Sequence, residues 1–236
     1  RASAGPVVGR STSVTTADGR SWIAAIARPI IQPSPFGSVG MPPSDTGDPA
    51  VHESTTPPVG RLDLLEAAVN AGKHALIQKP MLASPEELPR LLTIAEAAAA
   101  RGVRIAVNQN ARWAPVWREA TLLLRAGAIG EVVGVTHLHD KPLPPLVGTP
   151  FDQVEQMLLV DYLNRWFDIT SLWLAPAELV SVSAHSSRVP GQSDAALNPW
   201  QASASLRTST GATAQLRVVG SGTSAERGCP FWVHGT

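Results

Sequence analysis

The apolar residues in the middle of the chain follow a helical period and then form a short continuous run. Leu62, Leu65 and Val69 lie three or four residues apart, which places them on one helix face, and Gly72 is suited to ending that helix. The apolar run at residues 75–77 is too short for another helix and predicts a buried strand. We therefore predict a helix that leads directly into a strand.

The same alternation follows a second time. Ser84, Pro85 and Glu87 form a capping-box pattern that predicts the start of a helix, which we expect to continue to about Arg101. The β-branched residues at 103–107 predict another strand. Helices that alternate with short apolar strands are typical of a parallel sheet with crossover connections. We therefore expect a partial Rossmann-like parallel sheet of the α/β class.

The second half of the chain has a different pattern. We expect a helix over 114–126, whose inward face comprises Val116, Ala120, Leu123 and Leu124, and a long helical region over 152–174. Alternating apolar and polar residues predict strands at 132–139, 179–187, 200–208 and 213–219, and the final residues FWVHGT read as one more strand. Strands joined by short turns favour an open, mainly antiparallel sheet with helices on one face, an α+β arrangement.

The residues before position 54 differ from both halves. The first leucine is Leu62, and the stretch RPIIQPSPFGSVGMPPSDTGDP is dominated by proline, serine, threonine and glycine. We expect an irregular or atypical N-terminal segment at 1–53, a parallel-sheet domain at 54–112 and an α+β domain at 113–236. Because the chain does not begin with methionine and stops within an expected strand, we expect a fragment or a processed product.

Charge and cysteine content narrow the partners and the compartment. Nineteen lysines and arginines balance nineteen aspartates and glutamates, so no overall charge attracts nucleic acid or an anionic membrane. The single cysteine, Cys229, cannot form an internal disulfide and is typical of a reducing compartment. No apolar run approaches the roughly 20 residues of a membrane span. We expect a cytoplasmic protein that binds small molecules, with neither nucleic acid nor membrane as a partner.

The first candidate for chemistry is Lys79, which follows the strand at 75–77 in the stretch GKHALIQKP. Ligands of open parallel sheets bind outside the carboxyl ends of the strands, so this lysine is expected at a ligand crevice. A lysine in that position can donate or accept a proton if burial or a neighbouring cation lowers its pKa. The other interpretation is a solvated loop charge.

From residue 54 onward the order of motifs resembles the glucose–fructose oxidoreductase and inositol dehydrogenase family (Gfo/Idh/MocA). The likeness is carried by TTPP before a helix, AGKHALIQKP, GVRIAVNQNARWAP followed by LLRAGAIGEVVGV, and DYLNRWFD. The resemblance implies a dinucleotide-binding domain for NAD or NADP at 54–112. It also implies a substrate and oligomerisation domain at 113–236, whose open sheet joins copies into a homo-oligomer. The family's N-terminal glycine fingerprint is not found in this sequence, and the C-terminal end is expected to be incomplete.

The resemblance also implies site residues. Lys79 matches the catalytic lysine of the family's E-K-P motif, with Gln78 in place of the acidic residue. Asp161 matches the first acidic position of the family's D-x-G-x-H-x-x-D pattern, and Asp168 matches the last. The expected catalytic pair is Lys79 and Asp161. The residues expected to bind the cofactor are Thr56, Pro57, Pro58, Gln78 and Asn108, and those expected to contact the substrate are Arg112, Trp113, Arg165 and Asp168.

Three further positions depart from the family's pattern, and one of them is Leu163, which stands in place of a glycine. Arg165 stands where the family has a histidine that acts as general base, and Arg61 stands where many members have a histidine after the Pro-Pro pair. Because arginine stays protonated, Arg165 is expected to orient or charge-stabilise a substrate oxygen rather than to take its proton. The alternative for Arg165 is an ordinary ion pair with Asp161 or Asp168.

For the remaining histidine, cysteine and aromatic candidates, we predict a structural role rather than a functional one. His137 and His139 share one strand face, as a metal pair would, but no third ligand is indicated by spacing, so we predict an exposed strand edge and no metal. Cys229 has no histidine context in the sequence that would favour a thiolate. The aromatic and apolar residues at 166, 167, 173 and 174 are predicted to belong to the core.

Together these features predict an NAD(P)-dependent oxidoreductase that transfers a hydride to or from a sugar, cyclitol or related polyol. Lys79 and Asp161 would handle the proton, and the cofactor would supply the redox chemistry. The alternative is a catalytically inactive or truncated relative that serves as a ligand-binding or dimerisation module. The missing glycine fingerprint and the arginine at position 165 favour that alternative.

Overall fold

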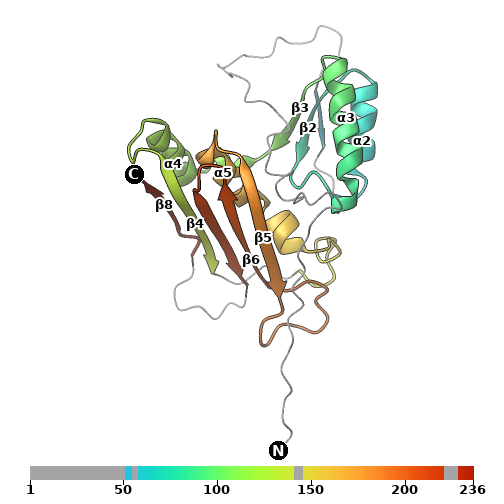
Figure 1. Ribbon diagram of the computed structural model, residues 1–236. Helices are drawn as coiled ribbons and strands as arrows, with labels where there is room; N and C mark the ends of the chain where they lie inside the picture. The colour runs from blue at the N-terminus through green and yellow to red at the C-terminus, as the bar shows by residue number, and fades with distance from the viewer. Residues whose placement is uncertain (1–50, 55–57, 141–145, 221–227) are drawn as a thin grey trace, which may run out of the picture.

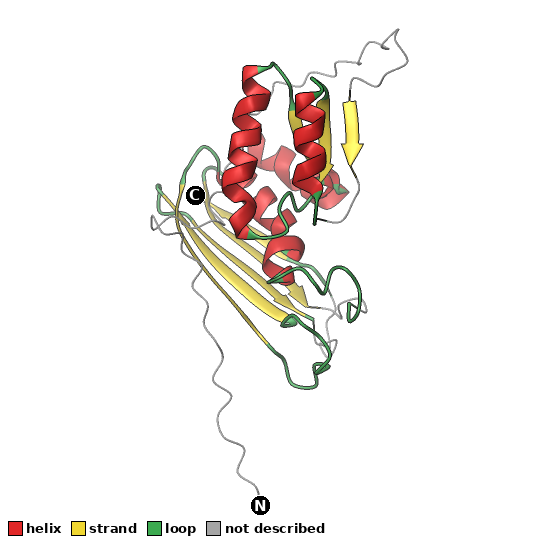
Figure 2. Cartoon of the chain, turned by 90° about the vertical axis from the view of Figure 1, so that its right-hand side faces the viewer, coloured by secondary structure: helices red, strands yellow, loops and turns green. Residues whose placement is uncertain are grey.

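The structure is a computed structural model that describes residues 51–54, 58–140, 146–220 and 228–236, and its elements form two sheets (Figure 1). The smaller sheet has the strand order β1-β2-β3, with β1 at Val51–Ser54, β2 at His74–Gln78 and β3 at Ile105–Asn108. All its pairings are parallel. Helices α2, Arg61–Asn70, and α3, Leu88–Ala100, make the crossovers and lie next to each other against this sheet (Figures 1 and 2).

The smaller sheet confirms the helix and strand alternation predicted from the sequence. Leu62, Leu65 and Val69 form the inward face of α2 and are each at most 2% exposed. Gly72 adopts a positive φ of 70°, which suits a glycine after a helix end. Strand β1 was not predicted. It starts at Val51, inside the stretch expected to be irregular, and the rest of that stretch lies outside the described residues.

The predicted capping box before α3 is wrong in its detail. Ser84 makes no side-chain cap, and a 3-10 turn, η1 at Pro85–Glu87, precedes the helix. The Glu87 carboxylate instead accepts a hydrogen bond of 2.6 Å from the backbone N–H of Ala83. The α-helix starts at Leu88, after the 3-10 turn, and the Ser84 side chain does not cap it.

The larger sheet has the strand order β5-β6-β7-β4-β8 and is mainly antiparallel. Among its described strands, β4 and β7 pair in parallel and the other pairs are antiparallel. Its strands are β4 at Val132–Asp140, β5 at Leu179–Ser187, β6 at Gln201–Thr208, β7 at Thr213–Val219 and β8 at Phe231–Gly235. Helices α4, Pro115–Arg125, and α5, Asn164–Leu174, cover one face of this sheet (Figure 2). The expected α/β plus α+β fold class is confirmed.

The inner face of α4 is only partly as the sequence predicted: Ala120 and Leu124 pack against the core of the larger sheet, but the other two predicted residues do not. Val116 and Leu123 are 66% and 50% exposed, whereas Thr121 is buried and Trp117 packs against the core of the larger sheet. The buried Thr121 hydroxyl donates to the Trp117 carbonyl and accepts from the indole N–H of Trp173. Thr121 and Trp117 thus share the inner face with Ala120 and Leu124, and Leu123 lies outside it.

The long helix expected over 152–174 is also corrected. A turn precedes a π-helical segment, η3 at Leu158–Tyr162, and α5 starts only at Asn164. Gln156 in the turn has a positive φ of 54°. The wider π-helical turn shifts the direction of the side chains that follow it. Such π-helical turns are frequent at functional sites.

The two histidines of β4 are buried, which corrects the expected exposed strand edge. His137 and His139 are 2% and 1% exposed, because β4 lies between β7 and β8 and this face of the strand packs against α5. The predicted core residues Trp166, Phe167 and Trp173 are buried in the same cluster. Across the described ranges, none of the helices combines the length and apolar character that a membrane crossing requires.

Candidate active site

Lys79 and Asp161 meet at the boundary between the two sheets. Lys79 directly follows β2, and Asp161 lies in η3. The Lys79 ammonium donates to the Asp161 carboxylate at 2.9 Å and lies 3.2 Å from the Asp161 main-chain oxygen. The side chains are only 13% and 9% exposed. Burial lowers the pKa of Lys79, and the charge and hydrogen bond of Asp161 oppose that effect.

Arg61 holds the backbone on both sides of Lys79. It is the first residue of α2 and is 2% exposed. Its guanidinium donates to the carbonyl oxygen of Gln78 at 2.9 Å and to that of Pro80. Burial lowers the pKa of Arg61, while the charge of Asp161 raises it. From the sequence, Arg61 was noted only as a replacement for histidine. An arginine in the first turn of an otherwise apolar helix face was the signal for its buried role.

Two side-chain contacts connect the segment after β3 with α5. The Arg112 guanidinium donates to both carboxylate oxygens of Asp168, at 2.6 and 2.5 Å, and this hydrogen bonding raises the pKa of Arg112. The Gln109 amide donates to the Asn164 side-chain oxygen at 2.8 Å. The predicted substrate residues Arg112 and Asp168 therefore bind each other. Gln109 and Asn164 lie within stretches that carry the resemblance, but neither was assigned a role from the sequence.

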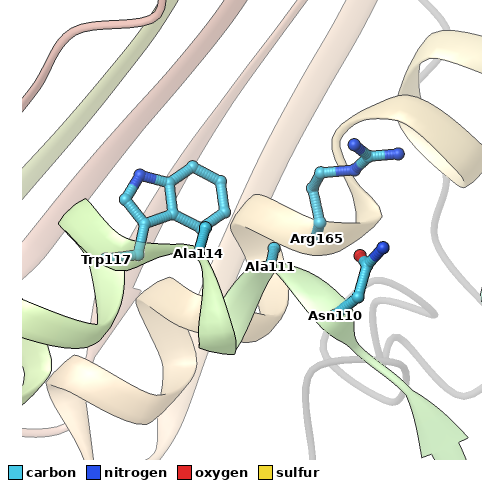
Figure 3. Close-up of a pocket in the computed structure, with 5 residues that line it drawn as sticks. All are labelled: Asn110, Ala111, Ala114, Trp117 and Arg165. Carbon is cyan, nitrogen blue, oxygen red and sulfur yellow. The ribbon is translucent and has the colours of Figure 1, made fainter.

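Arg165 lines a pocket of about 270 Å³ together with Asn110, Ala111, Ala114 and Trp117 (Figure 3). The tryptophan lies on one side of the two alanines, and Arg165 and Asn110 lie on the other. The Arg165 guanidinium is 5.9 Å from the centre of the Tyr162 ring, a cation–π distance. The ion pair expected as its alternative role is wrong, since within the described chain Asp161 binds Lys79 and Asp168 binds Arg112.

The remaining predicted site residues lie at the strand ends, before α2 or at the surface, and two of them lie outside the described residues. Gln78 and Asn108 face each other in register at the ends of β2 and β3. Pro58 is buried, and its carbonyl accepts the Arg61 N–H at 3.1 Å. Trp113 is 70% exposed and is not among the pocket-lining residues; the Arg118 guanidinium lies 5.3 Å from its ring centre. The predicted cofactor residues Thr56 and Pro57 lie outside the described residues.

A histidine does accompany Cys229, contrary to the sequence interpretation. The Cys229 sulfur lies 2.9 Å from His139 Nδ1, and the other ring nitrogen of His139 is 2.8 Å from the Tyr162 hydroxyl. Burial and the neighbouring Cys229 raise the pKa of Tyr162 to about 12. Sequence spacing could not reveal this contact, because β4 and the segment at Cys229 are brought together only by the sheet. Over the described ranges, no group of three or more His, Cys, Asp or Glu side chains could hold a metal ion.

Comparisons with known proteins support the fold and its lineage. No family model matches the chain. The 1,5-anhydro-D-fructose reductase of Ensifer adhaerens is 31% identical over 200 residues, which are 80% of this chain and 56% of that protein. A probable dehydrogenase from Thermotoga maritima superposes with a TM-score of 0.69 at 19% identity, covering 81% of this chain and 56% of that one. An inositol dehydrogenase homologue from Azotobacter vinelandii, solved with NADH and myo-inositol, has a TM-score of 0.65 at 18% identity, covering 79% of this chain and 48% of that one.

The expected resemblance to Gfo/Idh/MocA oxidoreductases is confirmed: the reductase is similar in sequence, and the two solved structures share the fold. The chain spans about half the length of each of them.

Proposed function

We propose that this chain is part of an NAD(P)-dependent oxidoreductase that transfers a hydride to or from a CH–OH group of a sugar, cyclitol or related polyol. The observation that carries the proposal is the ion pair between Lys79 and Asp161, since it places a proton-transferring group at the carboxyl end of a parallel strand. The pocket is lined in part by Arg165, whose α5 directly follows the segment that bears Asp161 and whose charge acts on Lys79, and it offers room for a small substrate.

The residues at the ends of β2 and β3 fit a nicotinamide cofactor. Gln78, Asn108 and Gln109 supply polar groups there, and the side-chain oxygen of Gln109 is buried with no hydrogen-bond partner within the described chain. Such an orphaned acceptor is costly unless a bound donor satisfies it. A nicotinamide group bound there would supply or accept the hydride. Thr56, Pro57 and Pro58 complete the proposed cofactor-binding set.

Lys79 acts as the proton-transferring group in this proposal. During reduction its ammonium donates a proton to the carbonyl oxygen of the substrate, and during oxidation its neutral amine takes the hydroxyl proton. Burial makes the neutral amine easier to reach, because it lowers the pKa of Lys79. Asp161 orients the ammonium and balances its charge. The contact between Arg112 and Asp168 holds α5 against the segment after β3, and these two segments line the proposed substrate pocket.

Domain roles and assembly follow the same proposal. Residues 54–112 form the dinucleotide-binding domain, to which β1 adds a strand from Val51, and residues 113–236 form the substrate and oligomerisation domain. The face of the larger sheet opposite its helices carries exposed side chains such as Ser205, Arg207, Gln215 and Arg217. This open face supports a homo-oligomer, which light scattering of the purified chain would detect. The neutral composition and single cysteine support a cytoplasmic location.

The test begins with cofactor binding. NADH and NADPH are titrated into the chain while nicotinamide fluorescence is followed, and a panel of sugars and cyclitols is then assayed for change in cofactor absorbance. Lys79→Met is expected to keep cofactor binding and to lower kcat by about 100-fold or more, because it removes the general acid–base group. Arg125→Met, which removes an exposed charge at the end of α4, is the control and should change neither quantity.

Two results would reject the proposal. If neither cofactor binds at millimolar concentration, the chain is better described as a non-catalytic ligand-binding or dimerisation module. If Lys79→Met turns over substrate as fast as the unaltered chain, Lys79 is not the proton-transferring group. For an active chain, the reduction rate should fall as pH rises through the pKa of Lys79, which lies below its ordinary value of 10.5.

A further inference from the structure

The proposed substrate pocket contains a cation that no carboxylate of the described chain neutralises. The Asp161 carboxylate forms an ion pair with Lys79 at 2.9 Å, and the Asp168 carboxylate accepts hydrogen bonds from Nε and Nη2 of Arg112. Over the described ranges, the Arg165 guanidinium has no ion pair, and its Nε is buried without a hydrogen-bond acceptor. A partly buried charge without a counter-ion is unfavourable, so an anion brought by a ligand would stabilise this arrangement.

The guanidinium is held in place by an aromatic ring. Arg165 packs 5.9 Å from the ring centre of Tyr162, whose hydroxyl is 2.8 Å from a ring nitrogen of His139. Because His139 is 1% exposed, the tyrosine has a fixed support. A guanidinium that is already positioned loses less entropy when it binds a carboxylate through two parallel hydrogen bonds. The geometry therefore favours recognition of a planar anion.

The size of the pocket restricts the ligand. Its volume of about 270 Å³ lies just below the range of roughly 300–1,000 Å³ that is usual for small-molecule sites. A monosaccharide-sized molecule fits such a volume, whereas a nucleotide-linked sugar would have to extend beyond it. The Asn110 amide can bond to hydroxyl groups, and the Trp117 ring offers an apolar surface for a sugar face (Figure 3).

We propose that the substrate class of this site is a sugar acid or a related polyhydroxy acid, whose carboxylate is bound by the Arg165 guanidinium. The inference rests on the proposed function and adds the charge of the substrate. Arg165, for which the described residues supply no counter-ion, matches one carboxylate. A phosphate dianion would need a second available cation, and Lys79 and Arg112 are both engaged.

The bound carboxylate also affects the proton-transferring group. Burial lowers the pKa of Lys79 most strongly, and the positive charge of Arg165 lowers it further. A carboxylate at Arg165 offsets that second effect, so the acid substrate raises the pKa of Lys79. Binding of the correct substrate thereby keeps the ammonium charged and ready to donate during reduction.

The test is calorimetric binding to the full chain without cofactor, so that it does not depend on turnover. The ligands are D-glucuronate, D-glucose, the neutral isostere D-glucuronamide, and D-glucose 6-phosphate. D-glucuronate is expected to bind about 10- to 100-fold more tightly than D-glucose or D-glucuronamide, which is the range for a hydrogen bond to a charged group. The preference should weaken as salt is added.

Three variants separate charge from folding. Arg165→Gln should abolish the preference for the acid, and Arg165→Lys should retain part of it because the charge stays while the two-point geometry is lost. Arg125→Gln, at an exposed position at the end of α4, should bind all four ligands like the unaltered chain. Thermal unfolding of each variant shows whether the fold is kept.

Several results would overturn the inference. These are equal binding of D-glucuronate and D-glucuronamide, tighter binding of D-glucose 6-phosphate than of D-glucuronate, an unchanged preference in Arg165→Gln, and the absence of binding by every ligand. None of them decides the proposed function, which fails only if NADH and NADPH do not bind or Lys79 proves dispensable. An oxidoreductase that uses neutral polyols would therefore be recognised as such.

Discussion

Replacement of His137 by phenylalanine should make the stability of this protein less sensitive to acid. His137 lies on the inner face of β4 and stacks against Trp166 and Trp173, with ring centres 6.0 and 5.6 Å away. It is 2% exposed, and its Nε2 is buried without a hydrogen-bond partner in the described chain. Burial in this aromatic cluster lowers its pKa from the ordinary 6.5 to about 4. The imidazole is therefore neutral in the folded protein at neutral pH.

The size and sign of the effect follow from this pKa difference. Above pH 6.5 His137 is neutral in both the folded and unfolded chains and contributes no pH dependence. Between 6.5 and about 4 the unfolded chain binds a proton that the folded chain does not, so stability falls as the pH falls. A difference of about 2.5 pKa units corresponds to about 3 kcal/mol. Below about pH 4 this group adds no further loss.

The assay is urea denaturation followed by tryptophan fluorescence at a series of pH values. His137→Phe should be about as stable as the unaltered protein at neutral pH, because the ring and its stacking are kept. Its relative stability should then rise by about 3 kcal/mol as the pH falls to about 4. His234→Phe, at an exposed position of β8, is the control and should follow the unaltered protein closely. Parallel pH curves for His137→Phe and the unaltered protein would refute the reasoning.

Two further substitutions test other contacts. Asp168→Ala should lower the free energy of unfolding by about 1–2 kcal/mol, measured by urea titration. This is less than the roughly 3–5 kcal/mol expected for a fully buried ion pair, because the Arg112 side chain is 38% exposed. An equal loss at high and low salt would contradict an ionic origin of the effect. Gly235→Ala should lower the melting temperature in a thermal scan, because a Cβ there would overlap the Ile129 backbone. Gly228→Ala meets only an ordinary contact and should melt normally, so equal shifts in both variants would show that the overlap is unimportant.

Local patterning was sufficient to predict most of the elements. The period of Leu62, Leu65 and Val69 predicted α2, and the alternation in the second half predicted the five strands of the larger sheet. Such patterns are informative because each element must bury one face, and the spacing of apolar residues records which face that is. The same reasoning failed for α4, where the sequence could not show that Trp117 and Thr121 would take the inner side.

Sequence alone determined that Lys79 follows a short strand and that Asp161 lies in a helical region, and motif order indicated that they share a site. Only the tertiary structure decided which charges are paired. Lys79 and Asp161 are 82 residues apart, and Arg112 and Asp168 are 56 apart. No local period relates such positions, because their distance depends on how two sheets pack together. Within the described part of the chain Arg165 has no ion pair, which becomes apparent only once both of its neighbouring carboxylates are seen to bind other cations.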